Sequence, residues 1–335
     1  MEFNSITKIF NAFNRLRVLI IGDVMIDRYI NGTVSRISPE APVPIVDVNS
    51  REDRLGGAAN VALNIAALGA TPVLCSVIGD DDAGSEMIEQ LSRNNIDSQG
   101  IIKSPNRSTT VKNRIISKGH QLLRFDEEVT DPLNEIDHQQ LKANIQRLVK
   151  DCDVIIFEDY DKSCINEDII QSTIEQAKAL GIPTAADPKV RNFHAYINCT
   201  LFKPNLIEMK RGLNMTINPT MLNDLDSAAM ALKSKMSFDW ILMTLSELGV
   251  YYFTKKKGVK QNAHLRKVSD VSGAGDTVIS IAALGLALEL PIEITAELAN
   301  LGGGIVCEYP GVVPIPKQRL EIEANNTVSL TAHMG

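Results

Sequence analysis

The sequence predicts an α/β protein with a mostly parallel central sheet, because short aliphatic runs alternate with helical patterns along most of its 335 residues. The runs are apolar throughout, which is typical of parallel strands that helices cover on both faces. Four of the later runs are followed directly by polar residues. The carboxyl ends of parallel strands meet at one edge of a sheet, so these polar residues are expected to share one ligand-binding edge.

The first elements follow from the local pattern. Residues Ile6 to Leu16 have apolar side chains at helical spacing and predict a short helix. Val18 to Ile21 is a continuous aliphatic run that ends in Gly22-Asp23, so Asp23 and Asp27 are expected near the carboxyl end of a central strand. Later strands are expected over residues 73–78, 154–157, 183–186, 201–202 and 241–244, an antiparallel pair over 250–253 and 258–265, and helices over 57–68, 274–289 and 292–307.

Two regions break this alternation. Residues 29–35 and 43–48 alternate apolar and polar side chains around a segment with three prolines, and prolines disfavour a helix. Residues 109–117 and 121–125 alternate around Lys118-Gly119-His120, which predicts a hairpin. A second, small β-sheet is therefore expected over about residues 28–55 and 107–127. The main domain is expected to cover residues 1–320, followed by a polar, loosely held C-terminal tail over 321–335.

The composition argues against several classes of function. The formal charge of −7 lacks the basic footprint of a general nucleic-acid binder. The five cysteines have no metal-ligand spacing and the chain starts without a signal-peptide pattern, so reduced thiols in a cytoplasmic protein are expected. The longest apolar stretch, Val278 to Leu290, is too short to span a bilayer, so no membrane role is expected.

The stretch Asp270-Val271-Ser272-Gly273-Ala274-Gly275-Asp276-Thr277 stands immediately before an apolar helical run. Gly273 and Gly275 permit a tight turn, and the first turn of the helix offers unpaired N–H groups that suit an anion. Asp276 would then be either a partner of the helix dipole or a base that faces the anion. Ser, Gly and Asp are also common capping residues, so this stretch alone leaves both readings open.

A second stretch, Gly56-Gly57 to Leu68-Gly69, is a glycine pair that opens a helix of small residues. Together, in this order and at this long spacing, the two stretches resemble the paired signatures of the ribokinase/PfkB carbohydrate kinase family. The resemblance extends from about Arg17 to about Pro316. It implies a ribokinase-like three-layer α/β/α sandwich with a small β-sheet lid over the sugar, and the apolar lid face makes a homodimer through the lid a hypothesis.

The resemblance also implies phosphoryl transfer from ATP to a sugar hydroxyl. Asp276 would take the hydroxyl proton, and the N–H groups around Gly273, Ala274 and Gly275 would stabilise the transferred charge. Asp27 would bind sugar hydroxyls, with turn capping as its alternative role. The other residues expected at the sugar are Gly56, Gly57 and Asn60.

Asn205 and Glu208 match the family's Asn-x-x-Glu motif, which implies that they organise Mg²⁺ through water, and Asn and Glu would equally suit the cap and third position of a helix. The residues expected at the nucleotide are Lys189, Asn205, Glu208, Thr244, Glu247, Gly249, Asn300 and Gly303. Two alternatives stay open for these residues. Small residues on helices such as Gly303 commonly serve helix packing, and Lys189 would equally suit a solvated loop lysine. The sequence leaves open whether a monovalent cation is also required.

A narrower resemblance concerns the acceptor. Arg36 to Pro44, Val271 in place of the family's usual Thr, and Asp159-Tyr160 followed by Lys162 are similar to bacterial heptose-7-phosphate kinases. These enzymes phosphorylate C1 of D-glycero-D-manno-heptose 7-phosphate in ADP-heptose and lipopolysaccharide precursor synthesis. Arg114, Arg124 and Lys162 are the basic residues expected to bind the substrate phosphate. Many members carry an adenylyltransferase domain whose His-x-Gly-His motif this sequence lacks, so a stand-alone kinase is expected.

Two alternatives remain at this stage. One is a kinase of the same fold for another sugar, sugar phosphate or nucleoside. The basic residues near the lid favour a phosphorylated sugar over ribose or a nucleoside. The other is a non-catalytic sugar or nucleotide sensor, against which the intact glycine turn and Asp276 argue.

Overall fold

The computed structural model describes residues 3–254 and 258–330, and its main feature is a nine-stranded sheet. Its strands, in spatial order, are β13 (Gly258–Gln261), β12 (Val250–Phe253), β11 (Trp240–Thr244), β10 (Leu201–Phe202), β9 (Thr184–Asp187), β8 (Val154–Glu158), β1 (Arg17–Gly22), β4 (Thr71–Gly79) and β5 (Asp97–Ser104). The pairs from β11 to β5 are parallel, and only the pairs β11–β12 and β12–β13 are antiparallel. The predicted, mostly parallel sheet is confirmed.

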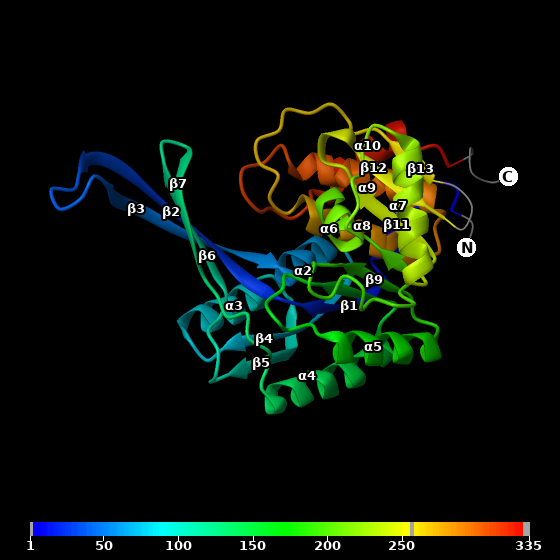
Figure 1. The fold of residues 1–335 in the computed structure, drawn as a ribbon, viewed down its shortest axis with the longest axis horizontal. Coiled ribbons are helices and arrows are strands. Elements are labelled where there is room, and N and C mark those ends of the chain that lie inside the picture. The colour runs from blue at the N-terminus through cyan, green and yellow to red at the C-terminus, as the bar shows by residue number, and fades with distance from the viewer. Residues whose placement is uncertain (1–2, 255–257, 331–335) are drawn as a thin grey trace.

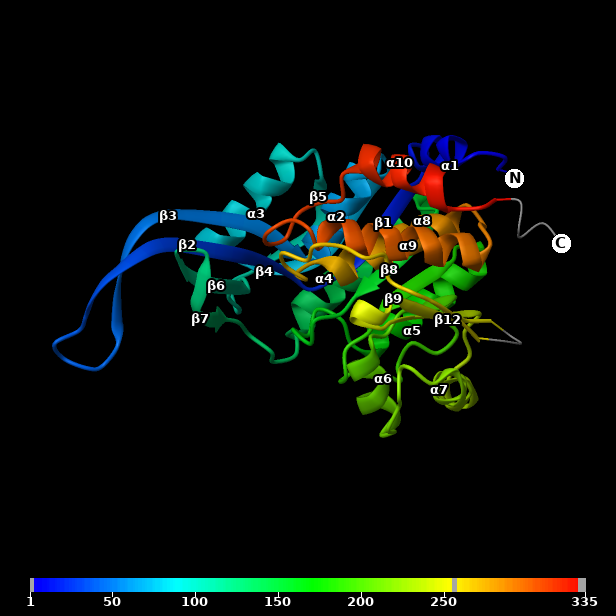
Figure 2. The same ribbon diagram turned by 90° about the horizontal axis from the view of Figure 1, so that it is seen from above.

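Helices cover both faces of this sheet (Figures 1 and 2). One face packs against α1 (Ile6–Phe13), α2 (Ala58–Ala67), α3 (Asp82–Arg93), α8 (Ala274–Ala287), α9 (Ile292–Val306) and α10 (Lys317–Thr327). The other packs against α4 (Glu135–Leu148), α5 (Glu167–Leu180), α6 (Leu206–Leu213) and α7 (Leu222–Lys235). Along β1, Val18 and Ile20 belong to the first core whereas Leu19 and Ile21 belong to the second, as the two-residue period of a strand requires. The result is the predicted three-layer α/β/α sandwich.

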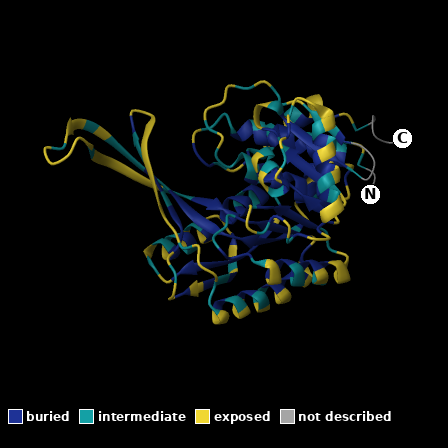
Figure 3. Ribbon diagram, viewed as in Figure 1, coloured by how far each residue is buried: buried dark blue, intermediate teal, exposed yellow. Residues whose placement is uncertain are grey.

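A separate four-stranded sheet projects from the body (Figure 1). Its order is β3 (Pro44–Gly57), β2 (Val24–Ile37), β6 (Val111–Ser117) and β7 (His120–Glu127), and β2 pairs parallel with β6 but antiparallel with β3. We call these four strands the lid. Its outer part is exposed whereas its root is buried (Figure 3). Every residue of β7 is exposed, including Leu122, Leu123 and Phe125, so the lid presents apolar side chains to solvent.

The structure departs from the expected elements in two places. The segment after Arg319 is not a loosely held tail, because residues as far as Thr327 form α10, which buries Leu320 and Ala324 in the core. These two apolar residues lie four positions apart in a mostly polar stretch, so the helical pattern is weak. Strand β5 was not expected, because its sequence is mostly polar. The last part of the predicted tail, residues 331–335, lies outside the described residues.

Two expected absences can be compared with the structure. No helix in the described part of the chain combines the length and apolarity needed to cross a membrane. All five cysteines are free thiols; four are buried, and Cys307 is half-buried.

Candidate active site

The two signature stretches meet where α2 crosses α8. Asn60 donates from Nδ2 to Oδ2 of Asp276 at 2.6 Å, and one turn later Asn64 accepts from the Thr277 hydroxyl at 3.1 Å. All four side chains are buried. The small residues of α2 permit this close crossing, which places the polar side chains of one helix directly against the other. Residues 216 positions apart are thereby brought into one site.

The turn before α8 has the geometry of an anion cradle. Gly273 has a φ of 78°, and a Cβ atom there would lie 2.9 Å from Nδ2 of Asn60, so both the backbone and the neighbouring side chain favour glycine. At Gly275 the nearest groups to a Cβ are Oδ2 of Asp187 and Nζ of Lys203, both at 3.8 Å. Gly273, Ala274 and Gly275 therefore form the amino end of a 14-residue helix, a position that favours an anion, and the Ala274 N–H also donates to the Val271 carbonyl at 3.3 Å.

Asp276 lies in the first turn of α8 and is only 4% exposed. Burial raises its pKa, while the hydrogen bonds from Asn60 and Tyr160 lower it. The Tyr160 hydroxyl donates to Oδ1 at 2.8 Å, so each carboxylate oxygen accepts one hydrogen bond. A carboxylate oxygen can accept more than one, which leaves Asp276 able to accept a proton from a further hydroxyl. Tyr160 was not among the predicted site residues; the available signals were its place two positions after strand β8 and its place in a segment that resembles heptose-7-phosphate kinases.

The predicted sugar-binding residues lie at the root of the lid. Asp27 on β2 is 4% exposed, and Arg114 on β6 donates to its Oδ1. Gly56 lies against this carboxylate, because a Cβ on it would be 2.3 Å from Oδ2 of Asp27. Gly57 caps α2 with a φ of 59°. The two signature glycines thus give Asp27 its space and start the helix that carries Asn60.

The other basic residues near the lid differ in their partners. Arg124 is half exposed and pairs with Asp126 at 3.2 Å, and Lys162 pairs with Glu128 at 2.8 Å. Lys112 lies over the Tyr160 ring, 5.3 Å from its centroid, and burial lowers its pKa. Within the described residues no carboxylate oxygen lies within 4 Å of the Lys112 ammonium group. Lys112 is therefore a lid cation that remains available to an anion.

Buried charges lie beneath the glycine turn, at the ends of β8, β9 and β10. Lys203 is 2% exposed and pairs with Asp187 at 2.7 Å. Lys189 pairs with Glu208 at 2.8 Å and lies 3.8 Å from Asp187. Among the described residues nothing donates to either oxygen of the buried Glu158 carboxyl group, whose pKa is raised well above its usual range by burial and by Asp187. Lys203 and Glu158 were not among the predicted site residues, although both lie at strand ends.

The Asn-x-x-Glu motif forms a complete capping box at the start of α6. Asn205 accepts from the Glu208 N–H at 2.8 Å, and Glu208 accepts from the Asn205 N–H at 2.7 Å. The alternative reading of these two residues as a helix cap is therefore confirmed. Thr244 pairs with Asn205 through an isolated parallel bridge, so β11 and the start of α6 lie side by side. Beyond it, Glu247 is exposed on a turn that Gly249 closes with a φ of 91°.

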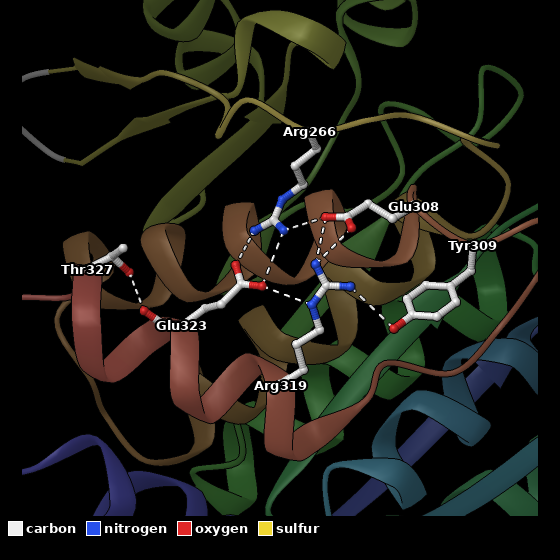
Figure 4. Close-up of polar contacts among 6 residues, drawn as sticks. All are labelled: Arg266, Glu308, Tyr309, Arg319, Glu323 and Thr327. Carbon is white, nitrogen blue, oxygen red and sulfur yellow. Dashed lines mark hydrogen bonds and ion pairs between the residues drawn. The ribbon is translucent and has the colours of Figure 1, made fainter.

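The remaining predicted nucleotide residues lie on α9, beside the segment 262–270. Asn300 donates to the carbonyl of Asn262 at 2.9 Å, and Gly303 packs against Val278. Figure 4 shows that Arg266, from the same segment, faces Glu308 and Glu323. Its guanidinium nitrogens lie 2.7 Å from Oε1 of Glu308 and 2.5 Å from Oε2 of Glu323. Arg319 on α10 contacts the same two carboxylates, and we call these four side chains the charge cluster. The cluster fastens the segment that leads into the glycine turn to α9 and α10.

The sequence matches the pfkB family of carbohydrate kinases over residues 15–318. It is 38% identical, over 93% of this chain, to the Bifunctional protein HldE of Methylobacillus flagellatus, and 36% identical, over 96% of this chain, to that of Syntrophotalea carbinolica. The chain spans 64% and 65% of the length of these two relatives.

Solved structures have the same fold. Phosphofructokinase-2 from Escherichia coli in complex with substrates and products superposes with a TM-score of 0.77 at 18% identity, over 92% of this chain and 99% of that one. Ribokinase of Arabidopsis thaliana complexed with ribose and ATP gives 0.72 at 16% identity, over 94% and 99%. The predicted ribokinase-like fold is confirmed, and the chain belongs to the pfkB family of carbohydrate kinases.

Proposed function

We propose that the chain transfers the γ-phosphoryl group of ATP to the C1 hydroxyl of D-glycero-D-manno-heptose 7-phosphate, in the synthesis of ADP-heptose for lipopolysaccharide. The observation that carries the proposal is the position of the buried Asp276 carboxylate in the first turn of α8, next to the glycine turn. The family supports a sugar acceptor and ATP as donor. The similarity of residues 36–44 to heptose-7-phosphate kinases supports the acceptor.

In the proposed reaction Asp276 takes the proton of the acceptor hydroxyl, and the hydroxyl oxygen of the acceptor attacks the γ-phosphorus. The bond from that phosphorus to the β,γ-bridging oxygen breaks, and ADP leaves. The N–H groups of the turn formed by Gly273, Ala274 and Gly275 face the charge that spreads over the transferred phosphoryl oxygens. The Lys203 ammonium lies close to the same place, 3.8 Å from a Cβ built on Gly275, and is paired with Asp187.

The residues present suit a magnesium ion that is bound through water. Glu208 is 5% exposed, and each of its oxygens already accepts one hydrogen bond, from Lys189 and from the Asn205 N–H. Its remaining lone pairs can accept from metal-bound waters. No cluster of three or more acidic, histidine or cysteine side chains that could form a full cage occurs in the described residues. When bound, Mg²⁺ would neutralise charge on the phosphates of ATP.

The 7-phosphate of the acceptor is proposed to bind at the lid root. Arg114, Arg124 and Lys162 are the predicted cations, although each already has a carboxylate partner. The free ammonium of Lys112, on the lid strand that carries Arg114, supports an anionic acceptor. The exposed apolar residues of β7 support the further proposal of a homodimer through the lid, which sedimentation of the purified protein would test.

The proposed activity is tested by ADP release from ATP and Mg²⁺ with a panel of sugars and their 7-, 6- and 1-phosphates. Heptose 7-phosphate is expected to give the fastest turnover, and Asp276→Asn is expected to lower kcat by roughly two to four orders of magnitude without unfolding the protein. Faster turnover of another sugar phosphate would mean that this compound, rather than heptose 7-phosphate, is the acceptor, and the proposed mechanism would stand. Binding of sugar and ATP without turnover would favour a sensor.

A further inference from the structure

We propose that Tyr160 is a positioning residue that orients Asp276 and keeps it in the state that accepts a proton. The proposal rests on the proposed function, in which Asp276 is the base. Its starting point is the 2.8 Å hydrogen bond from the Tyr160 hydroxyl to Oδ1 of Asp276. Asn60 donates to Oδ2 at 2.6 Å, so the carboxylate is fixed from two sides by groups from different elements.

The backbone around Tyr160 is held by hydrogen bonds to a buried carboxylate. The buried carboxylate of Asp23 accepts from the N–H of Tyr160 at 2.8 Å, of Lys162 at 3.1 Å and of Cys164 at 3.0 Å. Asp159, the neighbouring residue, accepts from Asn192 at 2.9 Å. The phenol therefore projects from a segment with little freedom, which is the condition under which a hydrogen bond positions its partner.

The Tyr160 ring is held by charge as well. The Lys112 ammonium lies over it at 5.3 Å from the centroid, and the Lys189 ammonium at 5.0 Å. Lys112 belongs to the lid, whereas Lys189 pairs with Glu208 on the nucleotide side. Cation–π contacts of this kind favour one orientation of the ring. Tyr160 thus lies between the proposed acceptor and donor sites, with its hydroxyl on the proposed base.

Loss of the hydroxyl would change the proton affinity of Asp276 in a known direction. The groups that face this carboxylate are Asn60 on α2, Glu158 and Tyr160 at the end of β8, Asp187 on β9 and Lys203 after β10. Burial and Asp187 raise the pKa of Asp276, and the donors Asn60 and Tyr160 lower it, together with Lys203. Without the phenol, the balance moves towards the protonated acid, which cannot act as a base.

The test is Tyr160→Phe, which keeps the ring and removes only the hydroxyl. A matched control is Tyr251→Phe on β12, because Tyr251 makes an equivalent hydrogen bond, to Asp226 at 2.7 Å, away from Asp276. Tyr160→Phe is expected to lower kcat by about tenfold to a hundredfold, since a hydrogen bond to a charged group is lost. The acid limb of the pH profile of kcat/KM is expected to move up by about one to two pH units. The control should change neither.

A double-mutant cycle separates this role from a structural one. If Tyr160 acts through Asp276, adding Tyr160→Phe to Asp276→Asn should change kcat less than about twofold. The assay uses the panel acceptor that is turned over fastest, at a temperature where thermal unfolding shows every variant folded.

Three outcomes would overturn the proposal. They are a Tyr160→Phe enzyme that matches the Tyr251→Phe enzyme in kcat and pH profile, an effect of equal size in both backgrounds, and an unmoved acid limb. Wild-type turnover by Asp276→Asn would instead refute the base assignment itself, and this inference with it.

Discussion

Replacing Lys203 with methionine should destabilise the protein far more than the same change in an exposed ion pair. Lys203 is 2% exposed, and its ammonium lies 2.7 Å from Asp187, which is 6% exposed. Burial lowers the pKa of Lys203, but the carboxylate of Asp187 raises it by more, so the ammonium group is charged in the folded protein. Removing one member of a buried pair costs roughly 3–5 kcal/mol. Lys189 remains 3.8 Å from Asp187 and offsets part of this, so about 2–4 kcal/mol is expected.

The measurement is equilibrium unfolding in urea at pH 7.5, with the free energy of unfolding extrapolated to water. Lys142→Met is the matched control, because the Lys142 ammonium also lies 2.7 Å from a carboxylate, that of Asp168, whose side chain is 51% exposed. The control should cost less than about 1 kcal/mol. Equal losses from Lys203→Met and Lys142→Met would refute the reasoning that burial, rather than distance, determines what the pair contributes.

Three further predictions concern the site and its supports. Gly273→Ala should cost roughly 1–2 kcal/mol of stability in the same urea assay, because the φ of Gly273 is 78°. It should also lower kcat, because the new Cβ would lie too close to the Asn60 side chain. A wild-type kcat would contradict this tight contact. Burial raises the pKa of Asp159 to about 6 from 3.8, so the folded state binds the proton more tightly than the unfolded chain. The stability due to this group should therefore fall by up to about 3 kcal/mol as pH rises from 4 to 6, and urea midpoints of Asp159→Asn should lack that slope. Arg266→Gln should destabilise the protein by about 1–3 kcal/mol through loss of charged hydrogen bonds to Glu308 and Glu323, and a change in the urea-derived free energy below about 0.5 kcal/mol would show that Arg319 alone suffices.

The sequence predicted the architecture well, because its signals are local. The aliphatic run of β1 and the glycine pair before α2 each reveal an element without knowledge of the rest of the chain. Helix α10 was not predicted, because it lies in a polar segment and buries only Leu320 and Ala324. The layers were therefore predictable, and their polar edges only in part.

The predicted site residues gather near one edge of the sheet, but their partners depend on tertiary structure. The sequence pattern predicts Arg114 as a cation that is available to a phosphate. In the structure it already pairs with the carboxylate of Asp27, 87 positions earlier. The direction of the Tyr160 phenol depends on Asp23, 137 positions upstream. Charge and spacing identify the residue types of such a site, whereas long-range pairs determine which side chains remain free.

Strand β2 anchors the projecting lid to the body of the protein. It starts among buried residues at Val24, carries Asp27 at the root, and runs without interruption of the chain to the exposed Ile37, a length of about 45 Å. Its pairing with β3 shifts register between Asn31 and Gly32 and again between Val34 and Arg36, and such irregularities bend and twist a strand locally. The root therefore keeps Asp27 within the packed body, whereas the tip at Ile37 is exposed to solvent. Contacts at Asp27 are thereby determined by the packed root, whereas Arg36 lies on the exposed part of the lid.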